Sequence, residues 1–98
     1  MTRERQIQRM CVQLIRGLGG AAYPLDQGRT TRNAPGLPDC WMFLPNGRGG
    51  LWLEAKSHGG ALSVAQQEFR GWCERCNVHH VVGGPAELAA YLKRVGIL

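Results

Sequence analysis

The stretch GLPDCWMFLPNGRGGLWLEAKSHG, residues 36–59, places three charged side chains around two short apolar runs. Asp39 precedes the first run, and Glu54 and Lys56 close the second. Both runs are rich in aromatic and aliphatic residues, and the Asn-Gly pair between them favours the positive φ angles of a tight turn. The stretch therefore predicts a β-hairpin with charged groups at one end.

The hairpin geometry predicts which of these groups meet. In an antiparallel hairpin the start of one strand lies beside the end of the other, so Asp39 and Glu54 become neighbours. Side chains alternate between the faces of a strand, so Glu54 and Lys56 share one face while Ala55 points to the other. Two carboxylates and an ammonium group are thus expected to converge.

Such a convergence suits metal-assisted chemistry on phosphate. Hard divalent cations such as Mg²⁺ or Mn²⁺ prefer carboxylate and carbonyl oxygens and help water attack phosphorus. We expect Asp39 and Glu54 to hold the cation, with the backbone carbonyl of Ala55 as a third ligand. Lys56 would orient the water or offset charge on the phosphate. The alternative is a solvated Glu-Lys pair on a strand edge, but the apolar sequence up to Glu54 favours a site.

Outside this stretch, the spacing of apolar residues predicts the remaining elements. They are a helix at 3–18, an edge strand or irregular extended segment at 21–27, a polar loop at 28–36, a helix at 63–77, a strand at 78–84 and a helix at 85–98. The strand at 78–84 can return parallel to its predecessor through a right-handed crossover. We therefore predict one α/β domain over residues 1–98, a small mixed β-sheet flanked by helices.

The amino-acid composition indicates which kind of molecule the protein binds. Twelve Lys and Arg against seven Asp and Glu give the chain of 98 residues a formal charge of +5, which attracts polyanions, and nucleic acid is the natural partner. No apolar run approaches the length of a membrane span, and the first residues lack the apolar stretch of a secretory signal. We expect no membrane partner, an intracellular (cytoplasmic) location, and four reduced cysteines that serve as small packing residues.

Three short motifs together resemble a known nuclease family. GLPD, then LEAK at hairpin distance, then LSVAQ resemble the PD-(D/E)xK nuclease superfamily and, within it, the virus-type replication-repair nuclease (VRR-Nuc) family. The resemblance implies a restriction-endonuclease-like fold with an αβββαβ core plus a C-terminal helix. It also implies a metal-dependent phosphodiesterase acting on DNA with Mg²⁺ or Mn²⁺. A phage or bacterial context fits this reading.

The resemblance also assigns roles to individual residues. It implies Asp39 and Glu54 as metal ligands, Lys56 as the catalytic lysine and Gln66 as an active-site residue on the following helix. The family tends to place a Glu of the first helix near the metal, and Glu4 is the residue that could match. Small stand-alone members are similar to junction-resolving enzymes that act as homodimers, which makes branched DNA a candidate substrate.

Two of these motifs admit a structural interpretation as well. Ser63-x-x-Gln66 is also a capping box at a helix start, and the capping and active-site roles are compatible. Cys73 and Cys76 followed by two histidines could suggest zinc. Adjacent histidines on a strand point to opposite faces, so only one could join, and ordinary packing is the favoured interpretation.

The remaining candidates concern DNA contact. Arg29 and Arg32 precede the expected metal site in a polar loop, and we expect them to touch the phosphate backbone. His58 follows Lys56 and could assist a proton transfer or touch phosphate. The three tryptophans, of which Trp72 falls in one helical register with Val64 and Cys76, are interpreted as core or dimer-face residues rather than stacking platforms for bases.

The sequence thus supports two functions. The first is a metal-dependent DNA endonuclease, structure-selective in the manner of a Holliday-junction resolvase and homodimeric. The alternative is a non-catalytic DNA-binding or assembly module that retains the nuclease fold. Asp39, Glu54, Lys56 and Gln66 are all present, which favours the enzyme because a retired site would be expected to have lost at least one of them.

Overall fold

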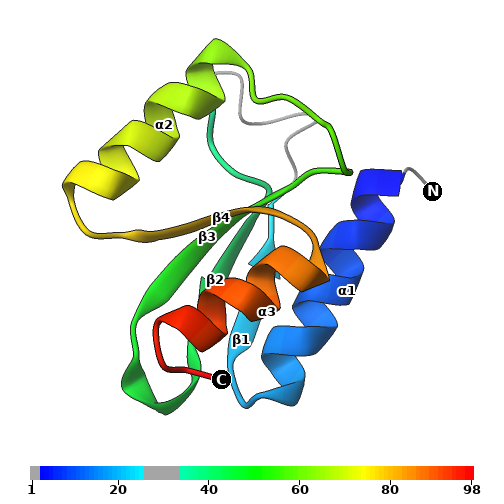
Figure 1. Ribbon diagram of the computed structural model, residues 1–98, viewed down its shortest axis with the longest axis vertical. Coiled ribbons are helices and arrows are strands. Elements are labelled where there is room, and N and C mark those ends of the chain that lie inside the picture. The colour runs from blue at the N-terminus through cyan, green and yellow to red at the C-terminus, as the bar shows by residue number, and fades with distance from the viewer. Residues whose placement is uncertain (1–2, 26–33) are drawn as a thin grey trace.

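The structure, a computed structural model, describes residues 3–25 and 34–98. In this part of the chain the elements follow the predicted order (Figure 1). They are α1 (Arg3–Gly17), β1 (Ala21–Pro24), β2 (Cys40–Phe43), a 3-10 helical turn η1 (Pro45–Gly47), β3 (Gly50–Ala55), α2 (Val64–Arg75), β4 (His79–Gly83) and α3 (Pro85–Arg94). Among these described residues no helix is long and apolar enough to cross a bilayer.

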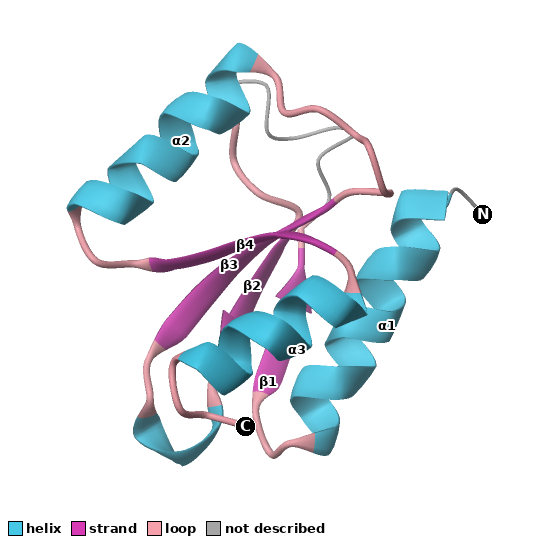
Figure 2. Cartoon of the chain, viewed as in Figure 1, coloured by secondary structure: helices cyan, strands magenta, loops and turns pink. Residues whose placement is uncertain are grey.

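The described strands form one mixed sheet in the order β1-β2-β3-β4 (Figure 2). β1 pairs antiparallel with β2 and β2 antiparallel with β3, whereas β4 returns parallel to β3 after the crossover through α2. The predicted fold class, a small mixed β-sheet flanked by helices, is therefore confirmed. β1 and β4 are the two edges of the sheet, and Pro24 ends the β1 edge, where its missing N–H costs no ladder bond.

The hydrophobic core lies between one face of the sheet and the pair α1 and α3 (Figure 1). Alternate strand residues point to this face, and each fully buried leucine contributes about 1.5–3 kcal/mol. The buried cluster consists of Cys11, Val12, Ile15, Ala22, Cys40, Met42, Leu44, Leu51, Leu53, Val81, Leu88 and Leu92. Burial raises the pKa of Cys11 to about 12 and that of Cys40 to about 11, so both act as neutral packing groups.

The opposite face of the sheet carries a chain of aromatic rings. Trp41 and Trp52 lie with ring centroids 4.8 Å apart, and Phe69 of α2 meets Trp52 edge-on at 5.5 Å. Gly50 is required beneath this cluster, because a Cβ atom there would lie 2.0 Å from the Trp41 ring. Packing is thus the role of Trp41 and Trp52, as predicted.

The register predicted for α2 is wrong in detail. Val64 and Trp72 are exposed, at 79% and 57%, and the residue that α2 buries is Cys73. Trp72 instead carries the Arg75 guanidinium 4.4 Å above its ring centroid, a cation–π contact on the surface. The prediction assumed that the most apolar residues of α2 face the sheet. The face that meets the sheet instead carries Cys73.

The turn of the hairpin is held against the end of α3. Asn46 and Gly47 adopt φ angles of 59° and 69°, as the Asn-Gly pair predicts. Arg48 donates to the carbonyl oxygens of Val95 at 2.9 Å and Gly96 at 3.3 Å. A cation at a helix C-terminus satisfies orphan carbonyls and complements the helix dipole. The far end of the hairpin is therefore anchored, which leaves the near end to position the candidate site.

Candidate metal centre and active site

The hairpin brings Asp39 and Glu54 together at the predicted end of the sheet. The register pairs Cys40 with Leu53, so the next step along each strand places Asp39 beside Glu54. The backbone N–H of Ala55 donates to Asp39 Oδ2 at 2.9 Å. This bond joins the loop before β2 to the end of β3 and fixes the carboxylate across the strand end.

The backbone of Asp39 is held as firmly as its side chain. Its carbonyl oxygen accepts a hydrogen bond from the Leu25 N–H at 2.8 Å and another from Gln8 Nε2 of α1 at 3.1 Å. Glu4 lies one turn before Gln8, and residues four apart share a helix face. Glu4 is exposed, and its charge is among the influences that raise the pKa of Glu54. The first turn of α1 therefore lies near enough for the charge of Glu4 to act on Glu54, and a role for Glu4 at the metal stays a prediction.

Glu54 is a buried acid without a complete set of partners. It is 4% exposed, and its Oε1 atom has no hydrogen-bond partner among the described residues. Burial, and next the hydrogen bond and the charge of Asp39, raise the pKa of Glu54 to about 8, against a smaller lowering by Lys56. A carboxylate in this position is costly to ionise unless a cation neutralises it.

The donor set fits a hard divalent cation. Mg²⁺ takes one or two carboxylates and keeps several waters, which an adjacent pair of acids and a neighbouring carbonyl can accommodate. In residues 3–25 and 34–98 no group of three or more His, Cys, Asp or Glu side chains could hold a metal ion, so Asp39 and Glu54 form a pair rather than a cage. Cys73 and Cys76 are free thiols; Cys73 is buried as expected, whereas the packing role expected for Cys76 is wrong, because it is exposed at the end of α2.

Lys56 and His58 follow Glu54 along the chain. Lys56 is half-buried, and its backbone N–H donates to the Gly83 carbonyl at 3.2 Å, which extends the parallel ladder by one residue. It lies two residues beyond Glu54 and so on the same face of the sheet. His58 is exposed in the loop that leads away from Lys56.

Gln66 lies at the start of α2, in the capping box predicted for Ser63. Ser63 N–H donates to Gln66 Oε1 at 2.8 Å, and Gln66 N–H donates to Ser63 Oγ at 3.1 Å. The box uses the amide oxygen and leaves the Nε2 group of Gln66 as a donor. The structural role of Gln66 is thus confirmed, and its active-site role stays a prediction.

Gly36 connects the first turn of α2 to the Asp39 segment. Its φ angle is 87°, and a Cβ atom there would lie 2.3 Å from the Ala65 carbonyl oxygen. Only glycine allows both this backbone conformation and this approach. The glycine of GLPD therefore packs the loop before Asp39 against the residues that precede Gln66, whereas the sequence predicted only a polar loop at this position.

Two site residues lie where the structure gives no description. Arg29 and Arg32 fall within residues 26–33, outside the described residues.

The hydrogen bond from Gln8 to Asp39 was not predicted from the sequence, because a single polar residue on an amphipathic helix gives no signal of a partner far away in the sequence.

The mixed sheet flanked by helices defines a small α/β domain, with two acids and a lysine at one end of the sheet. A search of solved structures matches the chain to one titled "VRR_NUC domain", with a TM-score of 0.74 and 22% sequence identity, over 96% of this chain and 97% of that chain. The VRR-Nuc fold implied by the sequence resemblance is thereby confirmed. A scan against protein-family models and a search of curated proteins find no match.

Proposed function

We propose that this chain is a metal-dependent DNA endonuclease that hydrolyses phosphodiester bonds. The observation that carries the proposal is the buried Glu54 carboxyl group, whose Oε1 lacks a partner, beside a fixed Asp39. Ionising this buried carboxyl group is costly without a cation, and the ionised group can bind a cation that takes part in catalysis. The VRR-Nuc fold and the formal charge of +5 support a nucleic-acid substrate.

Each residue at the strand end has a distinct task in this proposal. Asp39, Glu54 and the Ala55 carbonyl would hold Mg²⁺ or Mn²⁺, which supplies the positive charge that promotes ionisation of water and stabilises the phosphate. Asp39 is held ready by the hydrogen bond from Ala55 N–H. Lys56 orients the attacking water or donates to the phosphate oxygens. The burial of Glu54 strengthens these interactions because water does not screen them.

The outer contacts belong to the same proposal. Gln66 would donate from Nε2 toward the substrate, and Glu4 would add a carboxylate from α1. Arg29, Arg32 and His58 would contact the DNA backbone. We further propose that the enzyme acts on branched DNA as a homodimer, in the manner of a junction resolvase, since the family resemblance implies it.

Cleavage of labelled branched and linear DNA, with and without Mg²⁺ or Mn²⁺, tests the proposal. Asp39→Asn and Lys56→Ala should each lower the cleavage rate by about 10²–10⁴-fold, because they remove a metal ligand or a group that stabilises the transition state. Glu68→Gln, which changes an exposed acid on α2, is the matched control and should cleave like wild type. Lys56→Ala should still bind DNA nearly as well as wild type.

Two outcomes would contradict the proposal. Equal cleavage by wild type and Asp39→Asn would show that the assigned metal site is wrong. DNA binding without metal-dependent cleavage, together with no calorimetric heat of Mg²⁺ or Mn²⁺ binding, would support the non-catalytic module instead.

A further inference from the structure

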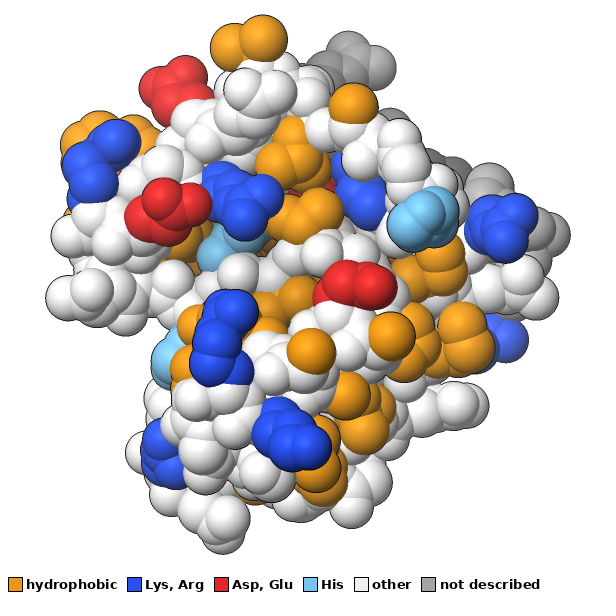
Figure 3. Space-filling model, in the orientation of Figure 1, with side chains coloured by type: hydrophobic (Ala, Val, Ile, Leu, Met, Phe, Trp, Pro, Cys, Tyr) orange, Lys and Arg blue, Asp and Glu red, His pale blue; other side chains and the backbone are white. Residues whose placement is uncertain are grey.

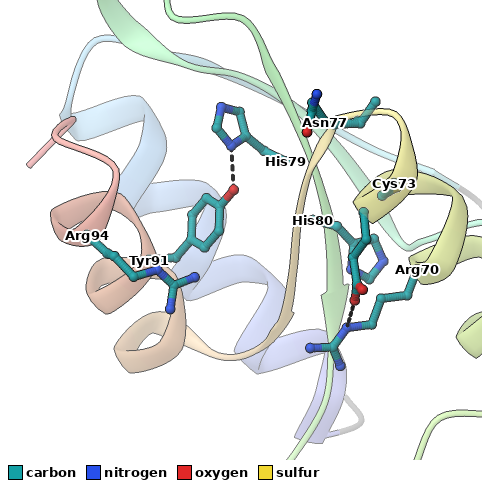
Figure 4. A pocket seen from close by; sticks show the side chains of 9 residues that line it. Arg70, Cys73, Asn77, His79, His80, Tyr91 and Arg94 are labelled. Atoms are coloured by element: carbon teal, nitrogen blue, oxygen red, sulfur yellow. Dashed lines mark hydrogen bonds and ion pairs between the residues drawn. The ribbon is translucent and has the colours of Figure 1, made fainter.

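A second polar site lies away from the metal centre, at the start of edge strand β4. It is a pocket of about 370 Å³, hereafter the β4 pocket. Figure 4 shows the strand in the middle, with α2 on one side and α3 on the other. Its lining residues are Arg70, Cys73, Glu74, Asn77, Val78, His79, His80, Tyr91 and Arg94.

Two arginines approach the β4 pocket from opposite sides of the strand. Arg70 comes from α2 and Arg94 from α3 (Figure 4). Arg70 uses Nε for its pair with Glu74, at 3.5 Å, and Arg94 lies 5.1 Å from the centroid of the Tyr91 ring. Within the described residues no hydrogen bond or ion pair occupies the two Nη groups of Arg70 or the Arg94 guanidinium. Both therefore keep planar sets of N–H donors, which suit phosphate oxygens.

The two histidines of the pocket add polar ring nitrogens to its lining. His79 is hydrogen-bonded through Nδ1 to the Tyr91 hydroxyl, and the Nδ1 atom of His80 is buried without a partner among the described residues. Burial, and next the charge of Arg70, lower the pKa of His80. The one acid in the lining, Glu74, is already paired with Arg70. The pocket thus offers donors and positive charge, the chemistry that selects an anion.

The sheet register places the β4 pocket at a definite distance from the metal centre. His80 pairs with Trp52 and Gly83 pairs with Ala55, so three strand residues separate the two sites. At about 3.3 Å per residue this is about 10 Å, which is about one to two phosphate steps along a DNA strand, because the helical path between successive phosphates is longer than the 3.4 Å axial rise. His80 also shares the face of Glu54, because both alternate in phase with Trp52. Figure 3 shows the surface at the β4 edge of the sheet hollowed between α2 and α3, with Lys and Arg side chains on both sides.

We propose that the β4 pocket is a phosphate subsite for the DNA strand that is cleaved. Arg70 and Arg94 donate to backbone phosphates about one to two nucleotides from the scissile phosphate. This inference rests on the proposed endonuclease function. It adds to that function a second point of contact that fixes the direction in which the strand crosses the edge of the sheet.

Equilibrium binding of labelled duplex DNA, in EDTA and over a range of salt, tests the contact. Arg70→Gln and Arg94→Gln should each lower the slope of log affinity against log salt by about 1 and weaken binding roughly five- to tenfold at about 0.1 M salt. Arg75→Gln and Lys93→Gln are the matched controls, since each removes a positive charge beside the pocket without lining it. Equal losses in the controls would show diffuse attraction and overturn the subsite.

Glu74→Gln should change the DNA affinity in the opposite direction. It frees Arg70 from its ion pair and removes a negative charge, so it should strengthen binding. Weaker binding would contradict a role for Arg70 in phosphate contact.

The spacing is tested by DNA carrying single neutral methylphosphonate groups. Neutralising a phosphate about one to two nucleotides from the cut should weaken wild-type binding and leave the Arg70→Gln/Arg94→Gln double variant unaffected. An equal effect on both proteins at every position would refute the assigned contact. NMR shifts at 77–80 with inorganic phosphate but not with DNA would assign a small free anion and overturn the DNA subsite.

The subsite and the nuclease proposal can fail separately. If wild type does not cleave but the slopes change as expected, the nuclease assignment is wrong and the phosphate contact stands. If wild type cleaves and the slopes match the controls, the metal centre stands and the subsite does not.

Discussion

The two acids of the candidate metal centre differ in how many hydrogen-bond partners the protein gives them. Asp39 accepts from Ala55 N–H with its side chain and from Leu25 and Gln8 with its carbonyl oxygen. Glu54 is more deeply placed, and its Oε1 has no partner in the described residues. Asp39 is therefore positioned before any ligand arrives, while Glu54 has a buried oxygen that a cation could pair with. A cation bound there would bind more tightly because Asp39 is already held in position.

The raised pKa of Glu54 predicts how the metal-free protein responds to pH. The unfolded chain loses this proton near the ordinary pKa of 4.5, whereas the folded protein keeps it up to about pH 8. This contribution to stability is fully present below about pH 4.5 and is lost as the pH rises through about 8. We expect urea unfolding in EDTA to show a loss of a few kcal/mol from this group between about pH 5 and pH 9.

Two comparisons isolate the contribution of Glu54. Glu54→Gln removes the titration, so its stability should decline less with pH than that of wild type, while Glu68→Gln should follow wild type. Added Mg²⁺ at about pH 8 should restore the stability of wild type but not of Glu54→Gln, because binding to the folded state alone stabilises it. Parallel pH profiles for wild type and Glu54→Gln would contradict the assignment.

At the scale of elements, the decisive contact is that of the GLPD turn with the first turn of α2. Gly36 approaches Ala65 so closely that any side chain would displace one of the two segments. The capping box at Ser63 and Gln66 fixes where the helix begins, so the turn packs on a defined surface. Residues of two different elements are thereby brought to one site.

Replacing Gly36 by alanine should separate these elements. The positive φ angle alone costs about 1 kcal/mol, and the clash with the α2 backbone adds a further 1–3 kcal/mol, so unfolding in urea should occur earlier. Gly49→Ala is the matched control, since its φ of 90° is similar and nothing lies within 4 Å of its Cβ position. Cleavage should fall in Gly36→Ala and persist in Gly49→Ala. Equal destabilisation of the two variants would show that the close contact of Gly36 with Ala65 does not affect the free energy of unfolding.

The sequence could predict local features better than the contacts between elements. The Asn-Gly turn, the capping box and the meeting of Asp39 with Glu54 follow from spacing within one hairpin or one helix start. The inward face of α2 did not follow, because the helix meets the sheet through Phe69 and Cys73 rather than through its most apolar stripe. Contacts such as Gln8 with Asp39 depend on how helices lie on the sheet, which no local pattern encodes.

At the scale of the whole molecule, the sheet separates a closed face from an open one. α1 and α3 cover the first, and the core is buried there. The second is covered only in part by α2, so Tyr23 and Phe43 remain 55% and 49% exposed although their rings contact each other, with centroids 5.9 Å apart. For so small a domain, exposed aromatic rings on the open face of the sheet mark the surface on which a second copy would find apolar area to bury.

If the proposed homodimer uses this aromatic face, its mass should depend on Tyr23 and Phe43. We expect light scattering at assay concentration to give about twice 10.8 kDa for wild type and a monomer-sized mass for Phe43→Ser or Tyr23→Ser. A two-fold interface uses the same patch on both copies, so each substitution removes two apolar contacts, each worth about 1.5–3 kcal/mol when fully buried. Met10→Ser is the control, because Met10 is 47% exposed on α1, away from the aromatic face. Circular dichroism would establish that the variants fold. A monomeric wild type would refute the homodimer, and a dimer that survives both aromatic substitutions would place its interface elsewhere on the molecule.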